Sequence, residues 1–371
     1  MNDVLKYRIG LTLIKGIGNN LAKNLLAYTG SEEAVFREKQ SVLAKIPGIG
    51  EVLSKEIVQQ NVLERAEREM VFIEKNKITP LYFTDRDFPY RLKECPDSPI
   101  MLYAKGNLSL NEGRFVAVVG TRNATEYGKE NCKKLISDMA EAGLQAVIVS
   151  GLAYGVDICA HKAAIDSGLP TIGVVGHGLD RIYPATHRPT AVKMLENGML
   201  LTEYLSETNP DRQNFVQRNR IISGLCDATV VIESASKGGA LITAELANDY
   251  NRDVFAFPGR VTDEWSAGCN TLIKTNRASL IESAADILRF MSWETNPENK
   301  AVPVQTTLFV DLSDDEQLIA GILRQNPEGI QLNELSLKTE KPVSKISSLL
   351  LGMEFKGLVK CLPGNLYKIV K

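Results

Sequence analysis

Glycine-bearing loops that suit a phosphate group follow several short apolar runs of this sequence. Such loops follow the runs that end at residues 119, 149, 175 and 232. Glycine lets the backbone approach a phosphate closely, and a helix after the loop offers free N–H groups and a positive dipole end. Two loops add a cation, and several add hydroxyl groups. The phosphate-binding residues expected from these loops are Gly120, Thr121, Arg122, Ser150, Gly151, Gly155, Lys237, Gly238 and Gly239.

A second cationic segment, residues 214–222, reads NFVQRNRII and is predicted to be helical. Phe215, Arg218 and Ile222 fall on one stripe of such a helix, and Arg220 lies well round from it. Two arginines and Asn219 on one turn suit a phosphate backbone, and Phe215 could stack on a base. The alternative is a solvated helix face whose arginines pair with carboxylates.

The glycine loops match neither common nucleotide-binding motif. The first reads GTRNAT instead of GxGxxG, and no loop reads GxxxxGK[ST]. NAD and ATP are therefore poorly supported, and we expect no cofactor. The remaining alternative is that the glycines only close tight turns between strands and helices.

Residues that could do metal or acid–base chemistry are scattered. The six cysteines form no CxxC, and the three histidines show neither HExxH nor HxxxH spacing, so we expect no disulfide framework and no metal site. Asp157 and His161 are four residues apart at the start of a predicted helix. Such an Asp more often caps the helix and such a His packs locally, and no recognisable nucleophile motif adjoins them. We predict no catalytic residue and no enzyme.

The elements that must position the glycine loops form an α/β pattern over residues 113–290. Apolar runs at 115–119, 146–149, 171–175, 199–202, 228–232 and 254–257 alternate with helical segments at 126–142, 156–167, 214–225 and 239–250. Strands that are apolar on both faces predict a Rossmann-like parallel sheet with helices on both faces. Ligands bind such sheets at the carboxyl ends of the strands, where the glycine loops would meet.

Residues 1–75 are predicted to be helical and contain two similar segments. LIKGIGNNLAK at 13–23 and AKIPGIGEVLSK at 44–55 each join two helices through Gly-Ile-Gly, which resembles a tandem helix-hairpin-helix, a SAM-like module. The turns serve either DNA contact or helix packing. Residues 76–112, rich in proline and aromatics, are predicted to be an irregular connector that ends in a short strand at 101–103.

The C-terminal part is predicted to be a separate winged helix. Residues 291–312 are polar, contain proline and indicate a linker. Residues 313–371 then carry helical patterns at 314–325, 331–338 and 342–356 and a hairpin. This fold serves duplex DNA or protein contact.

Composition is that of a globular protein without an overall basic excess. The chain has 371 residues, 44% hydrophobic and 24% charged, a net charge of −2 and a pI of about 6.1. Nucleic-acid binders usually show a basic excess, so binding must rest on a local cluster. No run approaches the roughly 18 apolar residues of a membrane span, and MNDVLKYRIG lacks a secretory pattern. We expect a cytoplasmic protein without membrane contact.

Together these motifs resemble the DprA/Smf family. The matching pieces are VAVVGTRNATEYG, IVSGLAYGVDICAH, TIGVVGHGLDRIYP, LLTEY, RNRIISGL, GGALITAELA, DVFAFPG and GCNTLI, in order over residues 115–275. The resemblance implies binding of single-stranded DNA with little sequence preference, a homodimer formed through the Rossmann-like domain, and no catalysis. It also implies protection of incoming DNA and loading of the recombinase RecA in natural transformation.

The resemblance assigns DNA-backbone contacts residue by residue. They fall on Gly120, Arg122, Ser150, Gly151, Gly155, Arg218, Asn219, Arg220, Lys237, Gly238 and Gly239. The sequence departs from the family pattern at three positions. Tyr154 stands where the family often has Arg, Val216 replaces a common Pro, and Gly239 replaces a Ser that could donate to a phosphate.

Two other functions remain as alternatives. GGALITAE at 238–245 is similar to the PGGxGTxxE motif of nucleoside-monophosphate phosphoribohydrolases, but Leu241 and Ile242 replace the Gly and Thr that would receive the phosphate. A transcription factor acting through the winged helix would use residues 341–355. That segment has Lys341 and Lys345 but lacks an arginine to read guanine.

Overall fold

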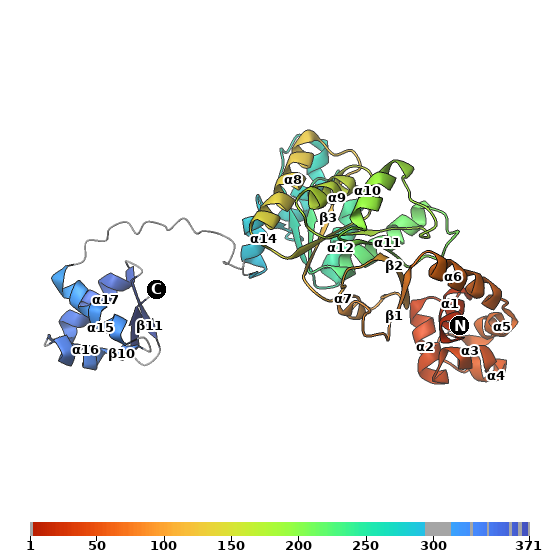
Figure 1. Cartoon of the computed structure of the whole chain (residues 1–371), viewed down its shortest axis with the longest axis horizontal. Coiled ribbons are helices and arrows are strands. Elements are labelled where there is room, and N and C mark those ends of the chain that lie inside the picture. The colour runs from red at the N-terminus through yellow and green to blue at the C-terminus, as the bar shows by residue number, and fades with distance from the viewer. Residues whose placement is uncertain are drawn as a thin grey trace. The chain divides into compact units, whose positions relative to one another are not determined.

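The computed structural model describes residues 3–293, 313–326, 329–339, 341–355, 358–362 and 366–369. The chain divides into two compact units, Met1–Asn296 and Pro297–Lys371 (Figure 1). From residue 294 on, the linker expected at 291–312 lies outside the described residues. Among the described helices, none combines the length and the apolar character that a membrane span requires.

A nine-stranded sheet forms the centre of the first unit, in the order β1-β2-β6-β5-β4-β3-β7-β8-β9. Neighbours from β6 to β9 pair in parallel. These strands are β3 (Arg114–Val119), β4 (Ala146–Ser150), β5 (Thr171–Val174), β6 (Met199–Thr202), β7 (Ala228–Val231), β8 (Asp253–Ala256) and β9 (Ser279–Leu280). The Rossmann-like α/β prediction is confirmed. The chain runs outward from β3 to β6 and then returns to place β7 beside β3, so the topological switch lies between β3 and β7.

The short strand expected at 101–103 is present as the start of β2 (Met101–Gly106), but the rest of residues 76–112 is not an irregular connector, and that part of the expectation is wrong. This segment also forms β1 (Thr79–Tyr82) and α7 (Tyr90–Lys93). β2 pairs antiparallel with β6, and β1 pairs antiparallel with β2, so the sheet is mixed. The start of β2, residues 101–104, is buried at every position, which suits a strand inside a sheet. Pro80 is tolerated because β1 is the edge strand.

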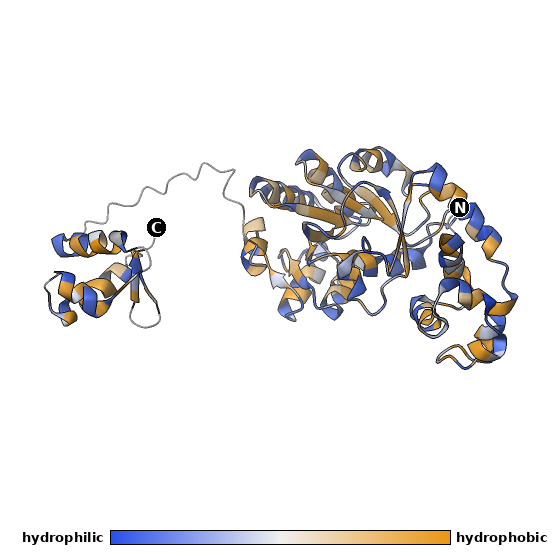
Figure 2. Cartoon of the chain, turned by 60° about the horizontal axis from the view of Figure 1, so that its bottom comes forward, coloured by the Kyte–Doolittle hydropathy of each residue, from blue (hydrophilic) through white to orange (hydrophobic). Residues whose placement is uncertain are grey.

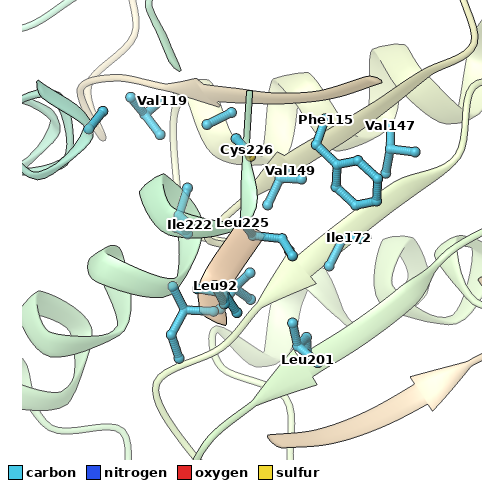
Figure 3. Packing of buried hydrophobic residues seen from close by; sticks show 14 of the residues in the cluster. Leu92, Phe115, Val119, Val147, Val149, Ile172, Leu201, Ile222, Leu225 and Cys226 are labelled. Carbon is cyan, nitrogen blue, oxygen red and sulfur yellow. The ribbon is translucent and has the colours of Figure 1, made fainter. Parts of the chain in front are cut away.

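Helices cover both faces of the sheet, because successive strand residues point to opposite sides. Phe115, Ala117 and Val119 pack with α7, α11 (Arg212–Leu225), α12 (Gly239–Asp249) and α13 (Ala267–Lys274). Val116 and Val118 pack with α8 (Glu126–Glu141), α9 (Val156–Asp166) and α14 (Ala284–Phe290). In Figure 2 the central strands are hydrophobic, and Figure 3 shows the first face, where strand side chains meet α7 and α11. α10 (Arg188–Met194) packs beside α9.

Six helices precede the sheet within residues 3–75. They are α1 (Asp3–Leu13), α2 (Asn19–Thr29), α3 (Glu32–Arg37), α4 (Gln40–Leu43), α5 (Gly50–Gln59) and α6 (Leu63–Lys75). Gly16 and Gly48 have φ of +82° and +84° in the two Gly-Ile-Gly turns. A Cβ on Gly16 would lie 2.8 Å from Leu53, and one on Gly48 would lie 2.9 Å from Leu21. Each turn thus packs against the helix that follows the other turn, so these glycines serve packing, and DNA contact here stays a prediction.

The second unit has the helices and hairpin expected of a winged helix. It contains α15 (Asp314–Gln325), β10 (Ile330–Gln331), α16 (Leu332–Thr339), α17 (Val343–Phe355), β11 (Val359–Leu362) and β12 (Leu366–Ile369). The strands form a sheet in the order β10-β12-β11. Leu323, Leu335, Ile346 and Leu350 are fully buried between the helices. Three short helices thereby share one small core.

Candidate nucleic-acid interface

A groove of about 670 Å³ lies at the topological switch of the sheet, where β3 and β7 end. Three segments form most of its lining: the loop after β3, the first turns of α11, and the loop that leads from β7 into α12. Most of the expected residues converge here, namely Gly120, Thr121, Arg122, Phe215, Arg218, Asn219, Lys237, Gly238 and Gly239. We call this cavity the groove.

Three cations open into the groove. Arg122, Arg212 and Lys237 are exposed, and none of them forms an ion pair with any described residue. Sequence reasoning missed Arg212, because the helix expected to begin at residue 214 begins at 212. The Arg122 guanidinium lies 5.8 Å from the centre of the Phe215 ring, which stacks on Tyr183 at 5.7 Å. Unpaired cations beside aromatic rings are suited to a polyanion.

Arg218 lines the groove with a buried side chain, so it is not the open phosphate contact that the sequence predicted. Its side chain is 4% exposed. One guanidinium nitrogen donates to the carbonyls of Gly151, at 2.7 Å, and Val174. Burial lowers the pKa of Arg218 to about 10, and nearby Asp157 opposes this shift. Arg218 therefore ties α11 to the ends of β4 and β5.

Arg220 does not line the groove, so the structure does not bring it together with the other expected DNA contacts. Two residues along a helix correspond to a rotation of about 200°, which turns Arg220 away from Arg218. Its guanidinium pairs with the Glu203 carboxylate and donates to the Asp97 carbonyl at 2.5 Å. Both partners belong to the fold, so Arg220 is a structural link.

Ser150, Gly151 and Gly155 also hold the fold together and do not line the groove, which corrects a second part of the expectation. Ser150 is fully buried and donates to the Val118 carbonyl at 2.7 Å. A Cβ on Gly151 would strike the Arg218 guanidinium. Gly155 has φ of +76°, and a Cβ there would strike the backbone of residues 121 and 122. These residues let the loop after β4 pass beneath the loop that carries Arg122.

His161 packs locally, as the sequence indicated, but Asp157 does not cap the helix α9. Asp157 is buried and accepts hydrogen bonds from the backbone N–H groups of Gly151, at 3.1 Å, and Ala153, at 3.4 Å. Burial raises the pKa of Asp157, and Arg218 opposes that shift. His161 Nδ1 lies 2.8 Å from the Thr171 hydroxyl. The Asp therefore orders the loop before α9 instead of capping that helix.

The helix after the first glycine loop is closed to an external anion. Glu233 is buried, and its carboxylate accepts hydrogen bonds from the Thr125 backbone N–H at 2.9 Å and the Thr125 hydroxyl at 2.5 Å. Thr125 in turn caps α8 by accepting from the Gly128 N–H. The protein's own carboxylate thus occupies the place where a dinucleotide-binding protein holds its pyrophosphate.

The start of α12 is open by contrast. Gly238 precedes the helix without a side-chain cap, and a Cβ built on Gly239 would meet no atom within 4 Å. Because its first N–H groups have no intrahelical partner, this helix start can accept an anion beside Lys237. The replacement of a family Ser by Gly239 leaves this space empty.

The other two departures have different surroundings. Tyr154 does not line the groove, and its exposed ring packs edge-on against His187 with ring centres 4.8 Å apart. Val216 is exposed and lines the groove. Of these two departures, only Val216 lies among the groove residues.

Two family models match the chain. The model described as DNA recombination-mediator protein A matches residues 79–292, which contain the whole groove. The model described as DprA winged helix domain matches residues 306–365.

Similar proteins agree with these models. Protein Smf of Synechocystis sp. is 31% identical over 99% of both chains. DNA processing protein DprA of Streptococcus pneumoniae is 40% identical over 58% of this chain and 75% of its own length.

Two solved structures extend the agreement to the fold. DNA processing protein A from Streptococcus pneumoniae superimposes with a TM-score of 0.65 at 33% identity, over 76% of this chain and 97% of that chain. The Helicobacter pylori protein, described for its single-stranded DNA binding mode, gives 0.53 at 29% identity, over 59% and 98%.

Proposed function

Because this chain belongs to the DNA recombination-mediator protein A family, also named DprA/Smf, we propose that it binds single-stranded DNA in the groove. The observation that carries this proposal is the convergence of Arg122, Arg212 and Lys237 beside the uncapped start of α12. Cations and open N–H groups contact phosphates, which every DNA sequence shares. Binding with little sequence preference follows from that chemistry.

The groove favours binding without catalysis. Asp157, a buried carboxylate in the groove lining, accepts hydrogen bonds from backbone N–H groups, and no nucleophile motif adjoins it in the sequence. Ile242 is 39% exposed and lines the groove, at the position where a phosphoribohydrolase-like site would need a hydroxyl. An aliphatic side chain donates no hydrogen bond to a phosphate. These features support our proposal that the chain binds DNA and does no chemistry on it.

The cellular role that we propose comes from the family. It is a cytoplasmic recombination mediator that protects incoming single strands in natural transformation and loads RecA on them. We propose that it acts as a homodimer formed through the Rossmann-like domain. The winged helix would supply a further contact, with duplex DNA or with protein.

The direct test is the equilibrium binding of a dT oligonucleotide and of a duplex of equal length, compared at the same salt concentration. We expect the single strand to bind more tightly. An R122A/K237A double variant should lose most of this binding, whereas K134A, which removes an exposed cation of α8 outside the groove, should not. Equal binding of the single strand by all three proteins would contradict the proposal. RecA loading is tested separately, by RecA filament formation on strands already covered by single-strand-binding protein.

A further inference from the structure

A second cavity, of about 880 Å³, adjoins the groove. It lies between the start of α8 and the loop of residues 258–266 that follows β8. Trp265 lines both this cavity and the groove, so the two spaces share a wall. Tyr127 of α8 contributes a second aromatic ring and is 48% exposed. We call this space the Trp265 cavity.

The Trp265 cavity is held open by hydrogen bonds within the fold. The Trp265 carbonyl accepts from the Ser234 N–H at 2.7 Å, which fixes the loop to the end of β7. Gly259 exchanges two hydrogen bonds with the Asn270 side chain, at 3.2 and 3.0 Å. The Tyr127 hydroxyl donates to the Pro258 carbonyl at 2.8 Å. A site that is formed before binding loses little entropy when a ligand enters.

The Trp265 cavity and the groove differ in the charge of their lining residues. The Trp265 cavity is lined by the exposed carboxylates of Asp263 and Glu264, by the buried Glu233 carboxylate that Thr125 already engages, and by one cation, Arg260. A phosphate would be repelled there, whereas the groove beside it offers mainly cations. Aromatic rings with carboxylate acceptors suit an uncharged, planar group that carries N–H donors. A nucleobase has these properties.

The ring expected to stack on a base is already engaged. Phe215 stacks on Tyr183, and the Arg122 guanidinium lies over its ring. Trp265 is a further large ring of the groove lining, and it also lines a cavity of the size that small-molecule sites have. A strand that follows the groove can therefore place a base there.

We propose that the Trp265 cavity receives a nucleobase of the strand whose phosphates occupy the groove, and that this base stacks on Trp265. The proposal rests on the proposed function, because the groove must hold the phosphates. It adds a site that responds to the base itself, while the cations of the groove respond only to the backbone. The protein would thus distinguish an unstacked single strand, whose bases are free to turn outward, from a duplex.

The test uses two single strands of equal length and equal phosphate number. One carries thymine at every position, and the other carries abasic residues. We expect W265A and Y127A each to weaken binding of the thymine strand by about tenfold, in the range of one lost base–aromatic stack, and to leave binding of the abasic strand unchanged. W265F should retain most of the difference between the strands. R122A should weaken both strands alike.

A second readout uses fluorescence. The chain has two tryptophans, so a W293F variant leaves Trp265 as the sole reporter. Thymine strands should quench it and abasic strands should not. The proposal is overturned if W265A and Y127A, shown to be folded by circular dichroism, bind both strands like wild type or weaken both equally. If wild-type protein binds neither strand, the proposal that the groove holds the DNA phosphates is wrong. That result contradicts the proposed function and is distinct from a failure of the Trp265 site.

Discussion

Arg122→Ala is the sharpest perturbation of the groove. Arg122, Arg212 and Lys237 are its three open cations, and the described residues offer Arg122 no carboxylate partner whose loss would disturb the fold. Its contact with the Phe215 ring is at the surface of the groove. The substitution therefore removes one positive charge and leaves the packed loops beneath it in place.

The size of the effect follows from counterion release. Each phosphate neutralised on a single strand contributes about 0.7 to the slope of log affinity against log salt. Three open cations predict a slope of about −2, and Arg122→Ala should reduce it to about −1.4. At roughly 0.1 M salt the loss of one such contact corresponds to about a fivefold weaker affinity. Arg122→Ala with Lys237→Ala should reach about 25-fold if the two sites act independently.

Fluorescence anisotropy of a labelled dT oligonucleotide, titrated between about 50 and 200 mM NaCl, measures both quantities. Lys134→Ala is the matched control, because it removes an exposed charge outside the groove. An unchanged slope in Arg122→Ala would refute the assignment. A slope lowered equally in Lys134→Ala would show that overall charge, and not the groove, governs binding.

Three further expectations concern the fold around the groove. Arg220→Ala should lower the free energy of unfolding, measured in urea, by about 2 kcal/mol, because it leaves the largely buried Glu203 carboxylate unpaired. The affinity of this variant for dT should fall far less than that of Arg122→Ala. Burial lowers the pKa of His161 from 6.5 to about 3, so stability should fall as the pH drops below 6.5, by about 3 kcal/mol at pH 4.5. His161→Asn, which keeps a donor toward Thr171, should lose this acid sensitivity in urea titrations at both pH values. A chain ending at residue 293 should keep its dT affinity, because the groove lies wholly within the first unit; a folded truncation that fails to bind would contradict this.

The parallel strands could be predicted because each is an apolar run buried on both faces. β3 to β8 begin and end within one or two residues of the predicted runs. β1 and α7 were missed, and β2 was expected only as a short strand at 101–103, because this segment contains prolines and aromatics that are typical of a loop. Its strand character comes from pairing with β6, almost 100 residues away along the chain. Such a contact leaves no local sequence pattern.

The site was predictable as a set of loops but not as a set of side-chain directions. Gly120 and Arg122 lie in the loop after β3 and Lys237 lies in the loop after β7, and the parallel topology brings these loops together. Helical spacing already separated Arg218 from Arg220, but both were expected to contact DNA. Their roles differ from the expected ones because α11 buries one against β5 and turns the other toward Glu203. Which residues a helix buries depends on what packs against it, and periodicity alone does not say that.

Glu233 explains why this α/β sheet would bind a strand and not a dinucleotide. In a dinucleotide-binding protein the helix after the first strand receives the pyrophosphate. Here that helix start is capped by Thr125, which donates two hydrogen bonds to the Glu233 carboxylate, and this carboxylate fits only because Gly128 has no side chain. The open helix start is that of α12, across the topological switch, beside Lys237. Moving the anion site from α8 to α12 places it beside the cations of two other segments, so that an extended chain of phosphates meets several contacts in succession.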